Sequence, residues 1–470
     1  MPEDLCLLTL TDAGALLRAR SLSPLELTQA CLRRIERLNP RLNAFITVTA
    51  ESALEQARAA EDEISRGLYR GPLHGMPLAL KDLIDTAGVA TTAASALFKN
   101  RVPKADAEVV RRLKQAGAVL LGKLNLHEFA YGGSGLISYF GVVRNPWAPE
   151  HIAGGSSSGA AAAVAAGLCF GALGTDTAGS IRLPAACCGI VGFKPTYGLV
   201  STRGVVPLAS SYDHAGPMAR SVRDAALLLQ AIAGYDPQDL ASRELPAPDY
   251  AAEISNHGRS LRAGILRQFF FEDLDAEVVA AINNALQVLE TLVAELSDAS
   301  IPVDTDRTVQ AAEAYAYHAA FVAEHPHLYQ PETLRRIRSG EEITAAAYIE
   351  KRRELEQMRS AARDLFAGCD LLVTPTVPLP APAIAELQAH PDELRKRELV
   401  LLRNTRPFNV LGLPAISVPC GFTAAGLPIG LQIAGPPAGE ALVLRLAQAY
   451  EQATDCHKAT PALADMTPPF

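Results

Sequence analysis

The chain has 470 residues, of which 49% are hydrophobic and 20% charged, so it can bury a large core and is not an intrinsically disordered sequence. Its net charge of -8 comes from acidic and basic residues scattered along the chain. No basic block is present, which argues against direct binding to a nucleic-acid backbone. Length alone is compatible with one large domain or with roughly two to three smaller ones.

The cysteines and the N-terminal residues indicate in which cellular compartment the protein is expected. The eight cysteines are widely spread, have no CxxC spacing and lie mostly in apolar runs, as is typical of buried free thiols. Residues Met1–Leu5 are acidic where a secretory signal needs basic residues, and no run of about 18 apolar residues occurs. We therefore expect a soluble, cytoplasmic protein that does not bind membranes.

Helical patterns dominate the first 66 residues. The segment 9–39 reads as helices, and Ser23–Glu26 forms a capping box at the start of the second, with a proline at its first position. The dipeptide Asn39–Pro40 predicts the end of that helix. An alanine-rich helix is expected over 50–66.

Strands and helices then alternate along the chain. The apolar run Met76–Leu80 predicts a buried strand, with Lys81 at its end. A helix over 106–115 leads into a second strand at 118–121. This alternation predicts an α/β layered fold.

Regular patterns also occur in the second half of the chain, on either side of an irregular region. Ala160–Ala166 is a strong helix former, whereas the segment 236–330 has no clear periodicity. We interpret that segment as a peripheral wall and not as a separate domain. The elements expected after it are a charged helix over 345–366, strands at 371–375 and 415–419, and a closing helix at 440–452.

Ser180 stands on a run of small residues and is a candidate nucleophile. Backbone N–H groups can reach a reacting carbonyl oxygen only where side chains are minimal, and Thr177–Gly179 provides such a stretch directly before it. A second polar, glycine-flanked segment, Gly154–Gly159, lies upstream and contains Ser156. The two segments together read as a serine nucleophile with a proton relay.

A serine at pH 7 needs a base to act as a nucleophile, and that base is usually histidine. None of the ten histidines has an obvious orienting carboxylate nearby in the sequence, although a triad is a spatial arrangement that sequence does not exclude. The alternative base is Lys81, because desolvation at the end of an apolar strand would lower its pKa below about 10.4. Ser156 would then pass the proton from Ser180 to Lys81.

Three motifs and their spacing give the chain a resemblance to a known family. The motifs are Gly75–Asp82, Gly154–Gly159, and Gly174–Pro184 running into Gly189–Thr196. Further matches extend over most of the chain, at Gly122–Asn125, Asn145–Trp147 and Asn409–Ser417. On these motifs the chain resembles the amidase signature family, whose members use a Ser, cis-Ser, Lys triad.

The resemblance implies the fold class and the domain organisation. It implies a single α/β domain over 1–470, with a central mixed sheet sandwiched by helices and no cofactor or metal. Its core would comprise about 60–235 and 370–455, and the wall about 236–345.

The resemblance also implies the roles of individual residues. Ser180 would be acylated, Ser156 would be the relay on a cis Gly155–Ser156 bond, and Lys81 would be the base. Two further groups are implied: oxyanion donors at the amides of Thr177, Ala178, Gly179 and Ser180, and supporting residues Asp176, Arg182 and Ser157, of which Asp176 and Arg182 would pair and brace the loop.

Two positions depart from the family pattern. Ala178 stands where relatives often have glycine, and its methyl group is tolerable unless the φ angle is positive. Gly439, near the Gly435–Pro437 turn, stands where glutaminase subunits of tRNA-dependent amidotransferases carry an acidic residue that contacts the substrate amino group.

Other motifs have competing interpretations. Gly155–Gly159 matches a nucleophile elbow centred on Ser157, but no clear strand precedes it. Ser157 and Ser158 are as suited to capping the next helix as to contacting the substrate. Gly117–Lys123 imitates a phosphate loop, yet its apolar interior indicates a strand. His127 with Glu128 has no second histidine to complete a zinc motif, and Asp213–His214 reads as a structural turn that could line the cleft.

The sequence thus predicts a hydrolase of small-molecule amides, which would also accept esters and carbamates because the same oxyanion forms. One alternative is a glutaminase subunit of a tRNA-dependent amidotransferase, with a partner chain. Another is a catalytically silent scaffold, although an intact Lys81, Ser156 and Ser180 set would be unusual there. The sequence is compatible with a homodimer but does not determine the oligomeric state.

Overall fold

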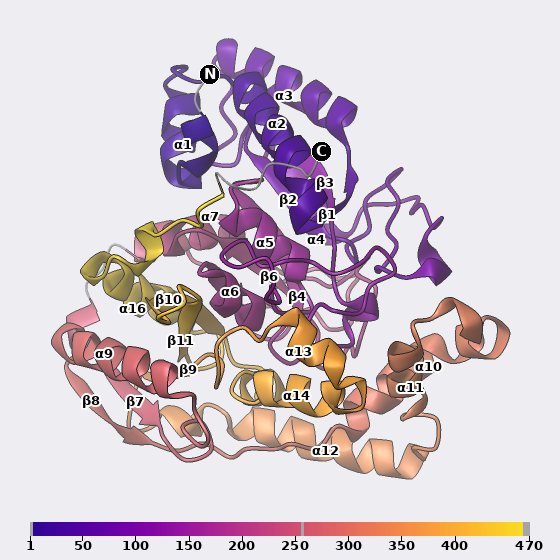
Figure 1. The fold of residues 1–470 in the computed structure, drawn as a ribbon. Coiled ribbons are helices and arrows are strands. Elements are labelled where there is room, and N and C mark those ends of the chain that lie inside the picture. The colour runs from indigo at the N-terminus through magenta and orange to yellow at the C-terminus, as the bar shows by residue number, and fades with distance from the viewer. Residues whose placement is uncertain (1–2, 255–257, 464–470) are drawn as a thin grey trace.

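The computed structural model describes residues 3–254 and 258–463, and within them eleven strands form one sheet (Figure 1). The order across the sheet is β1-β3-β2-β4-β6-β5-β10-β11-β9-β7-β8. The strands are β1 Phe45–Val48, β2 Pro77–Lys81, β3 Val119–Leu124, β4 Gly171–Asp176, β5 Val191–Lys194, β6 His214–Ala219, β7 Arg262–Leu266, β8 Glu295–Ala299, β9 Leu371–Pro375, β10 Ala415–Phe422 and β11 Pro428–Ala434.

Helices flank this sheet. Helices α5 and α6 pack against each other and against central strands, while α7, α9 and α16 form a second packed group. In Figure 1, α10 and α11 lie at the right-hand side, away from the strands. The helices are α1 Leu10–Arg18, α2 Pro24–Leu42, α3 Ala50–Ser65, α4 Glu108–Gln115, α5 Ser158–Ala165, α6 Arg182–Cys188, α7 Val222–Ile232, α8 Tyr250–Glu253, α9 Ala276–Leu292, α10 Thr308–Glu324, α11 Pro331–Arg338, α12 Ala345–Ala361, α13 Ile384–Ala389, α14 Leu394–Leu401, α15 Arg406–Val410 and α16 Glu440–Ala453.

The sheet is mixed, and its parallel pairs bring the candidate site together. Strand β2 runs parallel to both β3 and β4, with Leu80 opposite Leu173 in the β2–β4 pair. The carboxyl ends of parallel strands meet at the same edge of a sheet. Lys81 at the end of β2 therefore lies beside Thr175 and Asp176 at the end of β4.

Most elements expected from the sequence are present, and the α/β fold with a mixed sheet is confirmed. The capping box of Ser23 and Glu26 is formed at the start of α2. One boundary was wrong, because α2 continues through Pro40 and ends at Leu42, followed by Asn43 with a φ angle of 53°. Pro40 lies in the last turn, where its missing N–H removes only one helical hydrogen bond.

The segment 236–330 was expected to be irregular, and this expectation was wrong for part of it. Strands β7 and β8 lie in it, run parallel to each other, and extend the sheet beyond β9. Strand β8, with the sequence ELSDA, is only half-buried or exposed along its length. It therefore has no hydrophobic alternation that could predict a strand.

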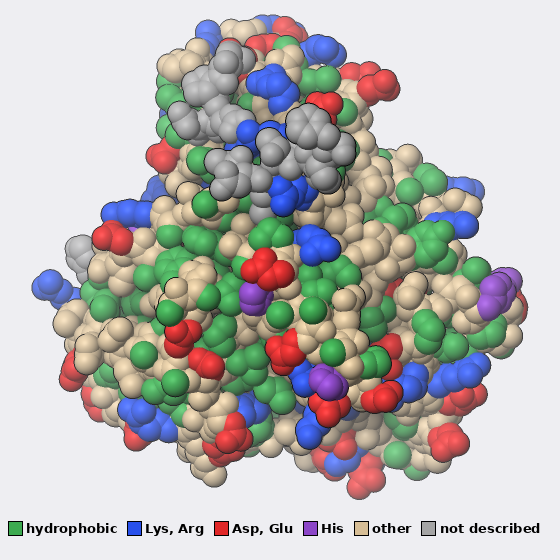
Figure 2. Space-filling model, viewed as in Figure 1, with side chains coloured by type: hydrophobic (Ala, Val, Ile, Leu, Met, Phe, Trp, Pro, Cys, Tyr) green, Lys and Arg blue, Asp and Glu red, His purple; other side chains and the backbone are tan. Residues whose placement is uncertain are grey.

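The surface view agrees with a charge pattern that has no large basic block. On the face drawn in Figure 2, acidic and basic side chains are scattered among hydrophobic and other residues, and no large patch of either charge is visible. Over the described residues, none of the helices combines the length and the apolar character that a bilayer crossing demands.

Candidate active site

Lys81 is fully buried at the end of β2, where its side chain contacts Ser156 in the loop before α5. Its Nζ lies 2.7 Å from Ser156 Oγ and 2.7 Å from Thr175 Oγ1. Burial lowers the pKa of this lysine to about 7, although the carboxylates of Asp176 and Asp213 act in the opposite direction. A substantial fraction of the amine is therefore uncharged near neutral pH.

The loop before α5 places Ser156 over Lys81. The Gly155–Ser156 peptide bond is cis, as the family resemblance implied. A Cβ atom at Gly155 would lie 2.8 Å from the backbone nitrogen of Gly135, so only glycine fits at this position. The Ser156 carbonyl accepts a hydrogen bond from the His127 amide at 3.1 Å, which fixes the loop on its other side.

Ser180 lies between β4 and α6, next to the Ser156 loop. Its backbone carbonyl accepts a hydrogen bond from the Ser157 amide at 3.2 Å, so the two loops are in direct contact. The residue is buried, with 5% of its surface exposed. Within 3–254 and 258–463, no side chain hydrogen-bonds to its hydroxyl, so none of the histidines there does so.

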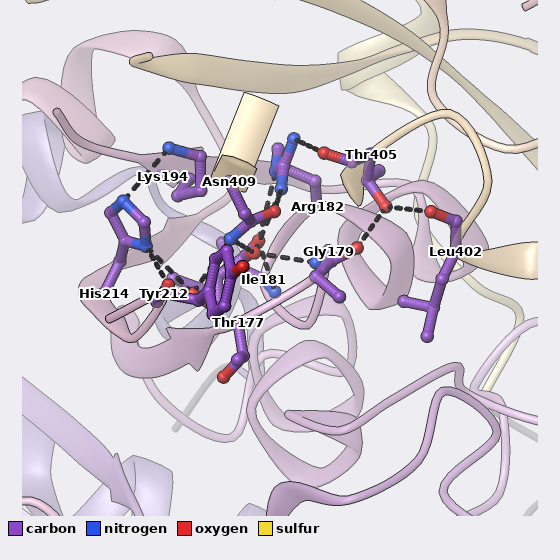
Figure 3. Close-up of polar contacts among 12 residues, drawn as sticks. Thr177, Gly179, Ile181, Arg182, Lys194, Tyr212, His214, Leu402, Thr405 and Asn409 are labelled. Carbon is purple, nitrogen blue, oxygen red and sulfur yellow. Dashed lines mark hydrogen bonds and ion pairs between the residues drawn. The ribbon is translucent and has the colours of Figure 1, made fainter. Parts of the chain in front are cut away.

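Asp176 braces the loop that carries Ser180, and its partners Gly179, Ile181 and Arg182 are labelled in Figure 3. Its carboxylate accepts hydrogen bonds from the amides of Gly179 at 2.7 Å and Ile181 at 3.1 Å, and it pairs with the buried Arg182 at 3.0 Å. Burial would raise the pKa of Asp176, but Arg182 outweighs this effect and holds the pKa well below its usual range. The Asp176–Arg182 pair predicted from the sequence is confirmed.

The contacts of Asp176 show that one predicted donor of the oxyanion hole, the Gly179 amide, was wrong. The Gly179 amide is committed to Asp176, so it is not free to bind an oxyanion. In the described part of the chain, no hydrogen bond occupies the amides of Thr177, Ala178 and Ser180, which stay available. Ala178 does not have a positive φ angle, whereas Gly179 has one of 135°, so the methyl group of Ala178 is accommodated.

A group of residues that sequence reasoning missed holds the same loop from the C-terminal third of the chain. Thr405 Oγ1 donates a hydrogen bond to the Ala178 carbonyl at 2.7 Å. Asn409 bridges the brace by donating to Asp176 at 2.8 Å and accepting from Arg182 at 2.6 Å. Asn409 lies in a matched motif, which was a signal, whereas nothing in the sequence near Thr405 points to this contact.

Asp213 supports Thr177 and does not act as a free acid in the site. It accepts hydrogen bonds from Thr177 Oγ1 at 2.5 Å and from the amides of Leu208 and Ala209. Burial raises the pKa of this carboxyl to about 7. The interpretation of Asp213–His214 as a turn was wrong, because the turn covers residues 210–212 and His214 begins strand β6.

Ser157 has a structural environment. Its hydroxyl donates to the Thr175 carbonyl at 3.2 Å and accepts from the Thr175 amide at 3.3 Å, and the residue is fully buried. It stands at the N-cap position of α5 but makes no capping hydrogen bond there. The helix-cap interpretation therefore fails for this residue, whose hydroxyl instead ties the loop to β4, an environment that argues against the nucleophile elbow.

The segment Gly117–Lys123, which imitates a phosphate-binding loop, instead forms part of the sheet, because Val119–Leu124 is strand β3. Lys123 is buried and donates to the Ile84 carbonyl at 2.6 Å, with Asp82 at 3.3 Å. Of the residues described, no three His, Cys, Asp or Glu side chains are grouped closely enough to hold a metal ion.

Comparisons with known proteins agree with the motifs and the geometry. A family model described as Amidase matches residues 26–444. A glutamyl-tRNA(Gln) amidotransferase subunit from Moorella thermoacetica is 42% identical over 98% of this chain and 99% of its own length. The corresponding protein of Geobacter metallireducens is 42% identical over 96% of this chain and 98% of its own.

Solved structures of amide hydrolases share the fold. A 6-aminohexanoate cyclic dimer hydrolase is 32% identical, with a TM-score of 0.89 over 98% of this chain and 100% of that chain. A peptide amidase from Stenotrophomonas maltophilia is 34% identical, with a TM-score of 0.83 over 96% of this chain and 98% of that chain. Because the family model and the relatives each cover most of the residues, the chain belongs to the amidase signature family.

Proposed function

We propose that this chain hydrolyses carboxylic amides through a serine acyl-enzyme, with Ser180 as nucleophile, Ser156 as proton relay and Lys81 as base. The observation that carries the proposal is the contact of 2.7 Å between Lys81 Nζ and Ser156 Oγ in a buried site. An ammonium group could not accept a proton, but the lowered pKa of about 7 makes the neutral amine accessible.

The first half of the reaction forms the acyl-enzyme. Lys81 accepts the proton of Ser156, Ser156 accepts that of Ser180, and the Ser180 oxygen attacks the amide carbonyl carbon. Negative charge then develops on the carbonyl oxygen, where the amides of Thr177, Ala178 and Ser180 can donate. Each such donor contributes about 3 kcal/mol to lowering the barrier.

The second half releases the amine and the acid. The protonated Lys81 returns a proton through Ser156 to the leaving nitrogen, so the C–N bond breaks and the amine departs. Water then attacks the acyl-enzyme with the same base, and Ser180 is released as a hydroxyl. Esters and carbamates form the same oxyanion, so we expect them to react as well.

A glutaminase subunit of an amidotransferase is the second candidate, and the relatives favour it more strongly than the solved structures favour a stand-alone amidase. Their 42% identity extends over nearly the whole chain, against 32–34% for the two hydrolase structures cited above. In this candidate the substrate is glutamine, and the ammonia passes to a partner chain.

One observation argues against glutamine as the substrate. Gly439 stands where the family resemblance expects an acidic residue for the substrate amino group, and it has no side chain to supply one. The adjacent Glu440 does not replace it, because its buried carboxylate accepts a hydrogen bond from the Thr196 amide at 2.7 Å. A glutamine ammonium group would therefore lack its expected partner.

Covalent labelling tests the proposal. A sulfonyl fluoride or organophosphate is expected to modify Ser180 in the wild-type chain, and peptide mapping identifies the adduct. A chain that hydrolyses no amide and gives no adduct at Ser180 would instead be a scaffold. Ammonia release from glutamine by the isolated chain, or copurification with a tRNA-binding protein, would favour the glutaminase.

A further inference from the structure

A pocket of about 640 Å³ lies among the residues before α10, helix α14 and the start of α15. This volume suits a small-molecule ligand. Six of its lining side chains are cationic, whereas Asp304 and Asp392 are its two carboxylates, so the lining has an excess of positive charge. We call it the arginine pocket after four of its cations, Arg307, Arg395, Arg403 and Arg406.

These four guanidinium groups have no carboxylate partner among the residues that the structure describes. Arg307 hydrogen-bonds to the Gln310 side chain at 3.2 Å, and Arg395 lies over the ring of Tyr131 at 5.6 Å from its centroid. Arg406 donates to backbone carbonyls of the 304–306 segment. By contrast, Arg335 at the same pocket is already paired with Glu332.

Arg403 is the fourth of these groups, and it too bonds to neutral acceptors, the Asn404 side chain and the Glu272 carbonyl. Burial, with Arg406 and Arg395 nearby, holds the pKa of Arg307 well below its usual range. Clustered, partly buried cations that make no direct ion pair with a carboxylate repel one another, and a bound anion would relieve this repulsion.

Two contacts join the arginine pocket to the loop of Ser180. Leu402 lines the pocket, and its side chain would lie 3.2 Å from a Cβ atom at Gly179, so the two residues pack together. Arg406 lies 5.9 Å from the centroid of the Tyr212 ring. Figure 3 shows Leu402 beside Gly179 and Tyr212 beside Thr177.

A third contact approaches from the side of Ser156. Tyr131, which Arg395 covers, is followed by the segment Gly132–Gly135. This segment packs tightly on Gly155, because a Cβ atom there would lie 3.3 Å from the Gly132 carbonyl oxygen. The lining residue Leu402 thus packs against the Ser180 loop, and Tyr131, which Arg395 covers, precedes a segment that packs against the Ser156 loop.

From this placement we propose that the arginine pocket binds a carboxylate of the substrate, so that the preferred amides carry a net negative charge. The proposal rests on amide hydrolysis at Ser180 and defines its substrate class. A glutamine zwitterion has no net charge, so the pocket favours an amide that has the carboxylate and lacks the ammonium. Monoamides of short dicarboxylic acids have this chemistry.

Steady-state hydrolysis of matched amides tests this assignment. Glutaramate differs from L-glutamine only by the absent α-ammonium, and a straight-chain amide of similar length is its neutral counterpart. The kcat/KM for glutaramate, or for its homologues with one methylene fewer or more, is expected to exceed those of both comparators by about 10-fold or more. Raising the salt concentration is expected to reduce this preference, because ions screen the attraction.

An Arg307→Gln variant is expected to lose most of the preference for the anionic amide, through a raised KM. Arg338→Gln, which removes an exposed charge from α11 outside the pocket, serves as the matched control and is expected to keep the preference. Labelling of Ser180 by a sulfonyl fluoride reports whether the Arg307→Gln variant is folded.

The outcomes separate this inference from the proposed function. Neutral amides hydrolysed as fast as glutaramate, with Ser180 labelled, would overturn the anionic substrate class and leave amide hydrolysis intact. A preference for glutamine over glutaramate would also overturn it and favour the glutaminase. No hydrolysis of any amide and no label at Ser180 would overturn both.

Discussion

The Lys81 amine and the Thr175 hydroxyl lie 2.7 Å apart at the ends of neighbouring parallel strands. Because Ser156 is also 2.7 Å from the same nitrogen, Thr175 fixes the direction in which the amine faces the relay. We propose that Thr175 is a positioning residue for the base, a role that its place at the end of β4 did not reveal in the sequence.

Replacing Thr175 by valine is expected to reduce kcat by about 10- to 100-fold with little change in KM, because the isosteric side chain cannot hydrogen-bond to Lys81. Thr175→Ser keeps the hydroxyl and is expected to restore most of the rate. Steady-state kinetics of both variants measure this difference. A valine variant as active as the serine variant would mean that Lys81 does not need this partner.

Replacing Ser180 by alanine is expected to reduce kcat by about 10⁴-fold or more and to abolish covalent labelling. Ser157→Ala is the matched control, because the Ser157 hydroxyl hydrogen-bonds, among the described residues, to the backbone of Thr175 alone. It is expected to be labelled like the wild type and to lose about 1–3 kcal/mol of stability. An inactive Ser157→Ala with an active Ser180→Ala would reverse the assignment of the nucleophile.

The pH dependence of kcat/KM is expected to follow the ionisation of Lys81. Its pKa is lowered to about 7 by burial, so the amine is charged and inactive below this pH and neutral above it. Activity is therefore expected to fall about tenfold per pH unit below pH 7 and to level off above it. A profile that is flat between pH 5 and 9 would exclude Lys81 as the base.

Breaking the buried pair of Asp176 and Arg182 is expected to cost about 3–5 kcal/mol, since Asp176→Asn leaves a buried guanidinium without its counter-charge. The control is Asp62→Asn at the exposed pair with Arg66, which is expected to cost less than about 1 kcal/mol. Urea unfolding at pH 7 measures both. Equal losses in the two variants would contradict the bracing role.

The pair of Asp176 and Arg182 also determines how the free energy of unfolding changes with pH. The pKa of Asp176 is lower in the folded than in the unfolded chain, so its contribution is present above the unfolded value of about 3.9. It is lost as the pH falls from there through the folded pKa. The stability difference between the wild type and Asp176→Asn is therefore expected to shrink in acid.

Gly179→Ala is expected to inactivate the enzyme, because a Cβ atom at this residue would lie 2.0 Å from Thr405 Oγ1 and its φ angle is 135°. The loop would have to move, and Ser180 with it. Ala178→Gly, one residue earlier, only removes a methyl group and is expected to retain activity. Kinetics and labelling of the two variants provide the measurement.

Local patterns explain why much of the fold could be predicted. The capping box at Ser23 and the apolar run before Lys81 each act within a few residues, so sequence reveals them. Strand β8 has no such pattern, because its position at the edge of the sheet permits polar residues. Its pairing with β7 depends on tertiary contacts that periodicity does not record.

The residues of the candidate site also divide into those that local sequence motifs predict and those that depend on tertiary contacts. Lys81, Ser156 and Ser180 lie in glycine-rich or strand-end motifs whose residue types indicate their chemistry. Thr405 and the commitment of the Gly179 amide to Asp176 could not be predicted, because both depend on how two distant loops meet. Amide groups have no sequence signature of their own, so which of them stay free emerges only from the folded chain.

The contacts of Arg182 have a consequence for synthesis on the ribosome. This side chain bonds to Thr405, Asn409 and Gln432, all more than 200 positions later in the chain. A polypeptide truncated before Thr405 would contain Lys81, Ser156 and Ser180, yet lack all three of these partners of Arg182. Catalytic competence is therefore expected only after nearly the whole chain has been made.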